Sequence, residues 1–260
     1  MNFWVGLLPT VAAFTAFTLS ILCLFAGTQK NFIIDADILT INTPNPSSNI
    51  GISDFYSVYV MSYCEGVLEE CSSPGSNVTR TGRNTTSCSD RKLPFWFDPE
   101  VVLANEIKTG QSLTDIGWPS AISADFVYMA TTSKTMSVLY VLGVGASGLS
   151  ILLRVWTSAT GRDPQLSNEF TCLFISLLNT GSASTIASVM ATEFVKLINH
   201  HAQGSGVSAD PGRKFLQMTW AAVILLFIAS SSILTAVIID RSKRCHCDPP
   251  EGEAKPLLEE

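Results

Sequence analysis

The sequence predicts an integral membrane protein, with an all-α bundle of four transmembrane helices and a small antiparallel β-sheet outside the bilayer. Hydrophobic residues make up 47% of the 260 residues and charged residues only 15%, whereas soluble domains usually contain about 25% charged residues. The charges are absent from four long stretches. Each stretch has the roughly 20 residues that a helix needs to cross the hydrocarbon core.

The first apolar stretch begins at Phe3, reaches Gly27 and meets no charge before Lys30. A cleaved signal peptide is the alternative interpretation. Such a peptide has a basic start and an apolar core of roughly 7–15 residues, and this stretch has neither. We therefore expect residues 1–27 to remain in the protein as its first span.

Three further apolar stretches predict the other spans, at residues 136–156, 170–192 and 216–239. The remaining segments are a large hydrophilic loop (28–135), two short loops (157–169 and 193–215) and a tail (240–260). The cores of the four predicted spans contain no charge, which disfavours a channel or transporter because intramembrane charges usually mark the transport path. Asn179 and the serines and threonines of the third span favour hydrogen bonding between helices over a polar conduit.

Two N-glycosylation acceptors, Asn77 and Asn84, lie in the large loop. Three of the seven cysteines lie there too, and both features are typical of the oxidising, non-cytoplasmic side. We therefore expect the large loop to be extracellular. Four spans then place both termini in the cytoplasm.

The large loop has the composition of a folded domain with a small sheet. Residues 32–41 and 55–63 are rich in aliphatic, β-branched and aromatic side chains and predict two strands, and residues 94–97 predict a short third one. Residues 72–89 are polar and rich in serine, threonine, asparagine and glycine. We expect that segment to be a surface excursion carrying the glycans.

Two helices are expected to follow the strands. Asp98 and Pro99 are a typical N-cap and first helical residue, so residues 100–108 predict a short helix that ends before Gly110. A helical pattern then runs from Pro119 without a breaker into the second span. That helix should begin outside the membrane and continue into it.

The three loop cysteines, Cys64, Cys71 and Cys88, allow three pairings. A bridge between Cys64 and Cys88 would join the end of one predicted strand to the start of another across the polar excursion. A bridge between Cys64 and Cys71 is also sterically feasible. The residues alone leave both alternatives open.

Three strings in this loop carry a family resemblance: DFYSVYVMSYCEG (residues 54–66), Cys88-Ser89-Asp90-Arg91, and PFWFDPEVVL (residues 94–103). With them, the chain resembles the fungal Sur-seven/PalI family, whose members are four-span plasma-membrane proteins similar in layout to claudins. The resemblance extends over nearly the whole chain and implies a claudin-like fold. It also implies a disulfide between Cys64 and Cys88, while Cys71 departs from the family pattern.

The resemblance implies an organising function in the membrane. Family members are associated with eisosome-type compartments, cell-wall integrity and endocytosis, and the PalI branch assists an ambient-pH signalling complex. That branch tends to have long cytoplasmic tails. The tail here, residues 240–260, is short and therefore favours the compartment branch. The expected partners are membrane lipids, lateral protein partners or further copies of the chain, and the cell wall.

Other classes of function find little support in the sequence. A net charge of −6 argues against nucleic acid, whose phosphates require a basic face. No serine, histidine and acid combination indicates catalysis, so we expect neither an enzyme nor a cofactor. The adjacent His200 and His201 cannot face one site on a helix, and Cys245-His246-Cys247 has the wrong spacing for a closed tetrahedral centre, so we expect no metal.

The tail contains two candidate signals. Cys245 and Cys247 follow a basic juxtamembrane cluster and are candidate S-palmitoylation sites. Glu253, Leu257 and Leu258 have the spacing of an acidic dileucine sorting signal, which predicts cycling through endosomes or the vacuole. The segment after Cys247 is rich in proline and glutamate, so we expect it to be unfolded and accessible.

Overall fold

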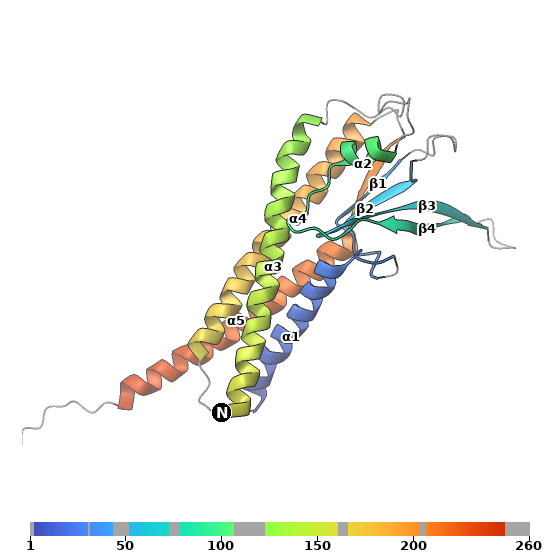
Figure 1. Ribbon diagram of the computed structural model, residues 1–260. Coiled ribbons are helices and arrows are strands. Elements are labelled where there is room, and N and C mark those ends of the chain that lie inside the picture. The colour runs from blue at the N-terminus through green and yellow to red at the C-terminus, as the bar shows by residue number, and fades with distance from the viewer. Residues whose placement is uncertain are drawn as a thin grey trace, which may run out of the picture.

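Four long helices run side by side and carry a five-stranded sheet at one end (Figure 1). This computed structural model describes residues 3–30, 32–43, 52–72, 79–106, 123–160, 166–202 and 206–247. The amino end of the first helix and the carboxyl end of the last both lie away from the sheet (Figure 1). The described residues therefore form a membrane bundle with a sheet at one end.

The helices of the bundle are α1 (Phe3–Phe25), α3 (Ser123–Thr160), α4 (Leu166–His201) and α5 (Arg213–Cys247). Each contains an apolar segment long enough to cross a membrane: Leu7–Phe25, Ala130–Thr160, Leu166–His201 and Arg213–Ile239. Around the bundle, α1 contacts α3, α3 contacts α4, α4 contacts α5, and α5 returns to α1. The four expected spans thus form one closed four-helix bundle.

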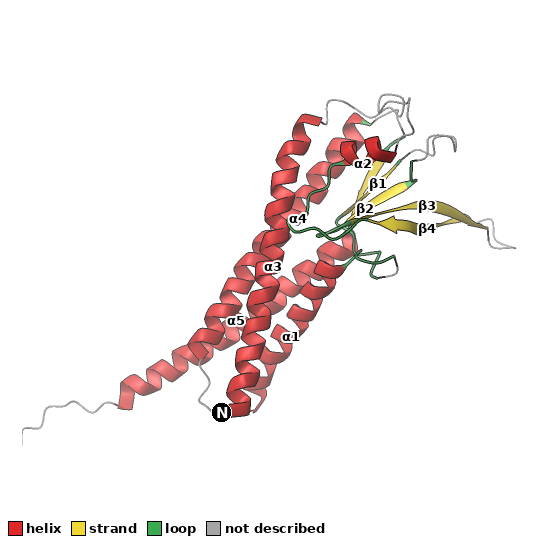
Figure 2. Cartoon of the chain, in the orientation of Figure 1, coloured by secondary structure: helices red, strands yellow, loops and turns green. Residues whose placement is uncertain are grey.

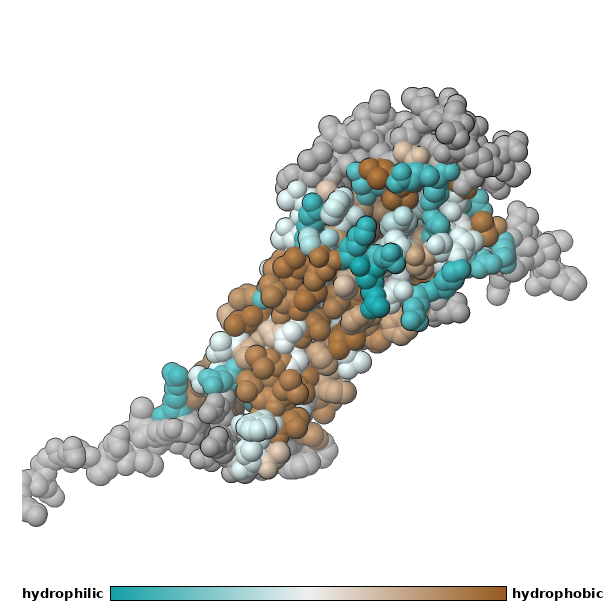
Figure 3. All heavy atoms as spheres, viewed as in Figure 1, coloured by the Kyte–Doolittle hydropathy of each residue, from teal (hydrophilic) through white to brown (hydrophobic). Residues whose placement is uncertain are grey.

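The inside and the outside of the bundle differ in side-chain size. Small residues such as Ala16, Ala222 and Ala229 are buried where α1 and α5 meet, and they allow the helix backbones to approach closely. Large apolar residues, including Leu152 and Phe227, point outward and give the helices the continuous apolar surface seen in Figure 3. This surface faces lipid in a bilayer, while the sheet end is hydrophilic (Figure 3).

The sheet is antiparallel throughout, with strand order β4-β3-β2-β1-β5. Its strands are β1 (Leu39–Asn42), β2 (Phe55–Val58), β3 (Tyr63–Ser72), β4 (Thr79–Cys88) and β5 (Ser208–Pro211). A short helix, α2 (Pro99–Glu106), lies between the sheet and the ends of α3 and α4 (Figure 2). We refer to β1–β5 together with α2 as the sheet domain.

Strand β5 comes from the segment between α4 and α5, where the sequence predicts only a short loop. It pairs with β1 at the edge of the sheet. The side chain of Asn199 at the end of α4 accepts a hydrogen bond from the backbone N–H of Ala209 and donates one to its carbonyl, at 2.8 and 3.0 Å. Both loops on this side of the bundle therefore contribute to a single sheet.

The first predicted strand is much shorter in the structure. Of residues 32–41, those before Leu39 form turns and irregular chain, and Ile33 has a positive φ of 46°. The backbone N–H of Ala36 donates to the carbonyl of Ile33. This segment reverses the chain between the end of α1 and β1, so only its last residues can join the sheet.

The second predicted strand, residues 55–63, is a hairpin. Strand β2 ends at Val58, the backbone N–H of Tyr59 donates to the carbonyl of Ser62, and β3 begins at Tyr63. Turns are usually polar because they lie at the surface. Here Val60 is fully buried against Met136 and other bundle residues, so the turn has the apolar composition of a strand.

The polar segment predicted over residues 72–89 is a surface excursion, as expected, but it is a regular strand in part. Its second half is strand β4, which pairs with β3 from Cys64 opposite Cys88 to Ser72 opposite Thr79, with a register shift between Glu65 and Gly66. Beyond Gly66 this hairpin projects from the molecule (Figure 1), and even Val67 and Leu68 are exposed. The hairpin residues beyond Gly66 whose burial the structure describes are exposed or half-exposed, so no alternation of apolar and polar residues reveals the strand in the sequence.

The third predicted strand, residues 94–97, is also wrong. The backbone N–H and C=O of Phe95 bond to the hydroxyls of Ser137 and Ser133 on α3, at 3.5 and 3.3 Å. Since the segment's backbone groups find partners on a helix, it needs no neighbouring strand. It follows a cis peptide bond between Leu93 and Pro94 and runs as irregular chain to α2.

The predicted helices agree with the structure. Helix α2 occupies most of residues 100–108, and α3 begins in the extramembrane segment and continues through the second span, as expected. Helix α5 continues past the predicted span end at residue 239 and includes the first residues of the tail.

Candidate functional site: the sheet domain and the groove beside α2

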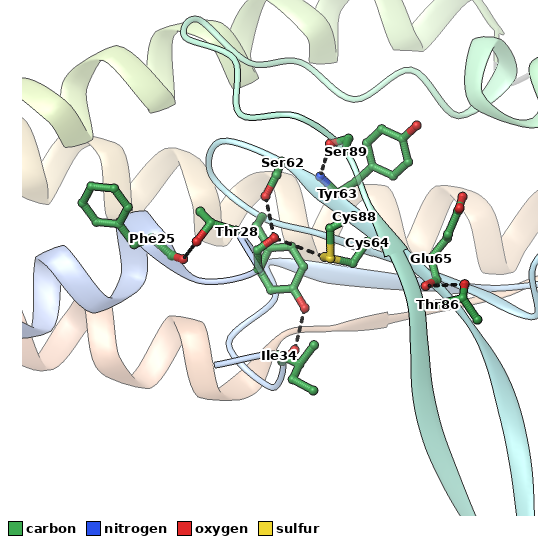
Figure 4. Close-up of a disulfide and its surroundings, with 12 residues drawn as sticks. Phe25, Thr28, Ile34, Ser62, Tyr63, Cys64, Glu65, Thr86, Cys88 and Ser89 are labelled. Carbon is green, nitrogen blue, oxygen red and sulfur yellow. Dashed lines mark hydrogen bonds between the residues drawn. A yellow bond between two sulfur atoms is a disulfide. The ribbon is translucent and has the colours of Figure 1, made fainter. Parts of the chain in front are cut away.

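Close packing and hydrogen bonds at the end of α1 hold the sheet domain on the bundle (Figure 4). Gly27 has a φ of 67°, and a Cβ atom there would overlap the ring of Tyr59. The Ser62 hydroxyl donates to the carbonyl of Gly27 at 3.0 Å, and the Tyr59 hydroxyl donates to that of Ile34 at 2.6 Å. Only glycine fits here without strain, and the sheet is thereby held in position relative to the membrane.

The disulfide of the sheet domain joins Cys64 on β3 to Cys88 on β4 (Figure 4). The two residues are direct cross-strand partners, with a Cα–Cα distance of 4.0 Å. Cys71 lies further along β3, opposite Arg80, so the alternative pairing of Cys64 with Cys71 does not occur. The bond closes the base of the projecting hairpin, where it meets the bundle.

Helix α2 is tied to the sheet by an acidic residue. Glu106 accepts a hydrogen bond from the Tyr56 hydroxyl on β2 and is also hydrogen-bonded to Glu65, the cross-strand neighbour of Tyr56 on β3. Burial and the neighbouring Glu65 carboxyl raise the pKa of Glu106 to about 7. Two carboxyl groups this close favour one proton between them.

A groove of about 440 Å³ lies between α2 and the irregular segment of residues 89–98. Tyr63, the buried Phe95 and the half-exposed Trp96 give it aromatic rings. The other lining residues are Ser89, Asp90, Lys92, Pro94, Asp98, Val101, Val102 and Asn105. This volume is within the roughly 300–1,000 Å³ of small-ligand sites, as is the mixture of apolar walls with a few polar groups.

Two contacts orient the walls of the groove. The Lys134 ammonium on α3 lies 4.1 Å from the centroid of the Trp96 ring, a cation–π geometry that orients the indole. The Asp98 carboxylate accepts a hydrogen bond from the Val101 N–H at 3.3 Å and caps α2. Trp96 nevertheless remains 46% exposed.

Inside the bundle, several buried polar groups bond to one another, while the buried hydroxyls of Thr180 and Ser230 have no protein partner among the described residues. The buried hydroxyls of Tyr140 on α3, Ser184 on α4 and Thr219 on α5 form a hydrogen-bonded triangle, with distances of 2.5 to 3.4 Å. Asn179 donates to a carbonyl of its own helix. The expected bonding between helices is thus confirmed for Ser184 and Ser188, the latter accepting from the Trp220 indole of α5 at 3.0 Å, but not for Asn179.

The other end of the bundle carries an ion pair. Arg154 on α3 lies 2.9 Å from Glu169 on α4, whose side chain is almost buried. This contact joins the two helices beside their short connection. Neither residue lies in the core of a predicted span.

The predicted modification and sorting sites are only partly within the described residues. Asn84 is exposed on β4, and its amide donates to Glu69 across the hairpin at 2.6 Å. Cys245 and Cys247 lie in the last turns of α5. Asn77 and the sorting residues Glu253, Leu257 and Leu258 lie outside the described residues.

His200 and His201 end α4, are exposed, and pack their rings edge to face. No group of three metal-binding side chains occurs within the described part of the chain. The groove beside α2, rather than the histidine pair, is therefore the candidate ligand site.

Sequence reasoning missed the groove residues Asp90, Trp96 and Asn105 and the pair of Tyr56 with Glu106. The aromatic run of residues 94–97 is the available signal, but its composition predicts a strand. Aromatic clustering outside the membrane, next to acidic residues, also fits a ligand site. Glu106 gave no signal, because its partners are about 40 to 50 residues earlier in the chain.

Residues 5–232 match the SUR7/PalI family. This range includes all four membrane-spanning helices, except the last turns of α5, and the whole sheet domain. A search of curated proteins finds no match.

Proposed function

We propose that this chain, which belongs to the SUR7/PalI family, is a non-enzymatic plasma-membrane protein that organises membrane compartments of the eisosome type and supports cell-wall integrity. The family is one of multi-pass membrane proteins, and the four apolar helices agree with that. The proposal places the sheet domain outside the cell and both termini in the cytoplasm. The exposed acceptor Asn84 on β4 supports this orientation.

The observation that carries the proposal is the shared core of sheet and bundle. Val60 of the β2–β3 turn is buried with Met136 of α3 and Ala187 of α4, and Leu39 and Tyr56 of the sheet pack with Phe194 of α4. A domain packed in this way moves with its helices. Such a rigid body suits a membrane platform that recognises neighbours on two sides, lipid and protein around the bundle and the wall above it.

The paired polar groups of the bundle support the same role. A transport path requires polar groups that water or a substrate can reach. Tyr140, Ser184 and Thr219 are buried and bond to one another. Lateral association through the apolar outer surface, with lipids, other proteins or further copies of the chain, is the mode of action we propose.

The test is the distribution of a fluorescently tagged copy in its own host. Stable cortical patches that do not recover after photobleaching, together with increased sensitivity to wall-perturbing dyes when the gene is deleted, are the expected results. A uniform, rapidly recovering distribution with unchanged dye sensitivity would contradict the proposal.

A second candidate function is an accessory subunit of an ambient-pH signalling receptor. The Glu106 and Glu65 pair favours it, because the pKa of about 7 for Glu106 lies where external pH varies. Co-purification with a multi-span receptor and loss of the alkaline growth response on deletion would support this alternative. Cortical patches without such a complex would exclude it.

A further inference from the structure

We propose that the groove beside α2 binds a neutral polysaccharide, with a sugar ring against Trp96 and sugar hydroxyls bonded to Asp90 and Asn105. The inference rests on the proposed function in one respect, since it requires the sheet domain to face the cell wall. It adds a ligand class and a binding site to that function. The argument depends on the rings, the polar groups and the charge of the groove.

The rings supply a surface for the apolar face of a sugar. A pyranose has one face of C–H groups, which packs on an aromatic ring, and a rim of hydroxyls. Tyr63, Phe95 and Trp96 line one continuous groove, although Phe95 is buried and serves as its floor. Rings with a polar edge, such as tyrosine and tryptophan, are suited to surfaces that are half apolar and half wet.

The polar groups supply partners for the hydroxyl rim. Asp90 offers carboxylate acceptors, and Asn105 offers an amide that both donates and accepts. Both are exposed and line the groove on opposite sides, one on the segment after β4 and the other on α2. A sugar hydroxyl also donates and accepts, so these groups match it without a charged ligand.

The charge of the groove gives no net attraction to anionic ligands such as phosphates and acidic peptides. Two carboxylates, Asp90 and Asp98, line it against the single ammonium of Lys92. The nearby ammonium of Lys134 lies over the Trp96 ring. With Lys134 counted, two positive charges balance the two carboxylates, so the groove lacks the excess positive charge that would attract an anion, and a neutral sugar chain needs no such charge.

The groove is open to a chain that passes across it. Asp90, Pro94, Trp96, Val101 and Asn105 are all exposed in the free protein. It also lies on the sheet domain rather than between the membrane-spanning helices, so a long polymer outside the membrane can reach it. A polysaccharide is therefore a better match than a small sugar that needs an enclosed pocket.

The experiment uses the full chain, purified in lipid nanodiscs after removal of its own N-glycans, and titrates it calorimetrically. The probes are the hexasaccharides of β-1,3-glucan, chitin and α-mannan, with anionic phosphatidylinositol vesicles as a separate arm. At least one hexasaccharide is expected to bind. Trp96→Ala should lower its affinity about tenfold, and Asn105→Ala about threefold.

The matched control is Trp156→Ala, because Trp156 is an exposed tryptophan on α3 that does not line the groove. It should leave the affinity unchanged. Thermal unfolding of every variant identifies a fold defect, and the exposed Asn105→Ala keeps the test decisive if Trp96→Ala fails to fold. Affinity unchanged in Asn105→Ala and in a folded Trp96→Ala, no binding of any hexasaccharide at millimolar concentrations, or binding of the vesicles alone would overturn the proposal.

Failure of this inference is distinct from failure of the proposed function. If the wild-type protein forms stable cortical patches but binds no hexasaccharide, only the groove assignment is wrong. If it forms no patches and deletion leaves dye sensitivity unchanged, the organising function is wrong, and a measured affinity for sugar would still support the groove.

Discussion

Tyr56 on β2 donates a hydrogen bond from its hydroxyl to the carboxyl group of Glu106 on α2. This contact joins the sheet to the helix that forms one wall of the groove. Glu65, opposite Tyr56 on β3, is the second partner of Glu106. The attachment of α2 therefore depends on a carboxyl group whose pKa is about 7.

We predict that α2 is held less firmly as the pH rises through 7. The folded pKa of Glu106 is raised from 4.5 to about 7, so the folded state binds the proton more tightly than the unfolded state. The stabilisation is complete below about pH 4.5 and is lost as the pH rises through 7. Hydrogen exchange of the α2 amides, corrected for the intrinsic rate, should show stronger protection at pH 5 than at pH 8.

Glu106→Gln should make this protection nearly independent of pH, because glutamine stays neutral. Glu193→Gln is the control, since Glu193 is an exposed glutamate on α4 and should leave the wild-type profile unchanged. The same pH dependence in Glu106→Gln as in the wild type would show that another group controls α2.

Loss of the disulfide should destabilise the sheet domain by roughly 3 kcal/mol, according to the chain-entropy model. Cys64→Ser and Cys88→Ser should have similar effects, because each breaks the same bond between residues 24 positions apart. Lower surface delivery and a lower unfolding temperature are the measurements. Cys71→Ser and the unpaired Cys172→Ser should be milder, and an effect of Cys71→Ser equal to that of Cys64→Ser would contradict this prediction.

Glycosylation gives the test of orientation. If the sheet domain is extracellular, treatment with an endoglycosidase should increase the gel mobility of the protein made in its own host. Asn84→Gln should remove one step of the shift. The double variant Asn77→Gln/Asn84→Gln should remove the shift completely. Asn105→Gln, outside any acceptor triplet, should change nothing. Absence of a shift in the wild type would remove the main support for this orientation.

Two glycines of α3 offer a matched test of helix packing. A Cβ atom at Gly143 would collide with the Thr180 hydroxyl and come within 3.1 Å of its backbone nitrogen, whereas one at Gly145 would meet nothing within 4 Å. Both substitutions by alanine gain about 1 kcal/mol of helix propensity. Gly143→Ala should be the less stable variant by about 1–3 kcal/mol, the usual cost of overpacking. Equal unfolding temperatures for the two would refute the close approach of α3 and α4.

Local properties of the sequence predicted the bundle, α2 and the continuation of α3 from outside the membrane into the second span. A span is recognisable because the bilayer requires an uninterrupted apolar run, and the start of α2 because Asp98 and Pro99 act on adjacent residues. The pairing of Cys64 with Cys88 followed only from the family resemblance. Its position opposite on neighbouring strands became visible in the fold.

The sheet was predicted less well, because one of its turns is buried and one of its hairpins is exposed, the reverse of the usual arrangement. The β2–β3 turn is apolar since Val60 inserts into the bundle, and the β3–β4 hairpin is polar since it projects into solvent beyond Gly66. Phe95 and Trp96 line a groove, Phe97 packs on the ring of Tyr63, and the Phe95 backbone bonds to α3. In each case the composition of the segment reflects how far its side chains are buried. In this domain the buried residues are not always in strands, and the strands are not always buried.

The sequence by itself determined that the chain spans a membrane four times, because apolar length and the absence of charge are properties of each segment alone. Tertiary structure alone decided that β5 joins β1, that Glu106 meets Tyr56, and that Trp96 and Asn105 line one groove. Those relationships connect residues from 9 to about 170 positions apart. Their formation depends on how the sheet packs on the bundle, and no local pattern encodes that packing.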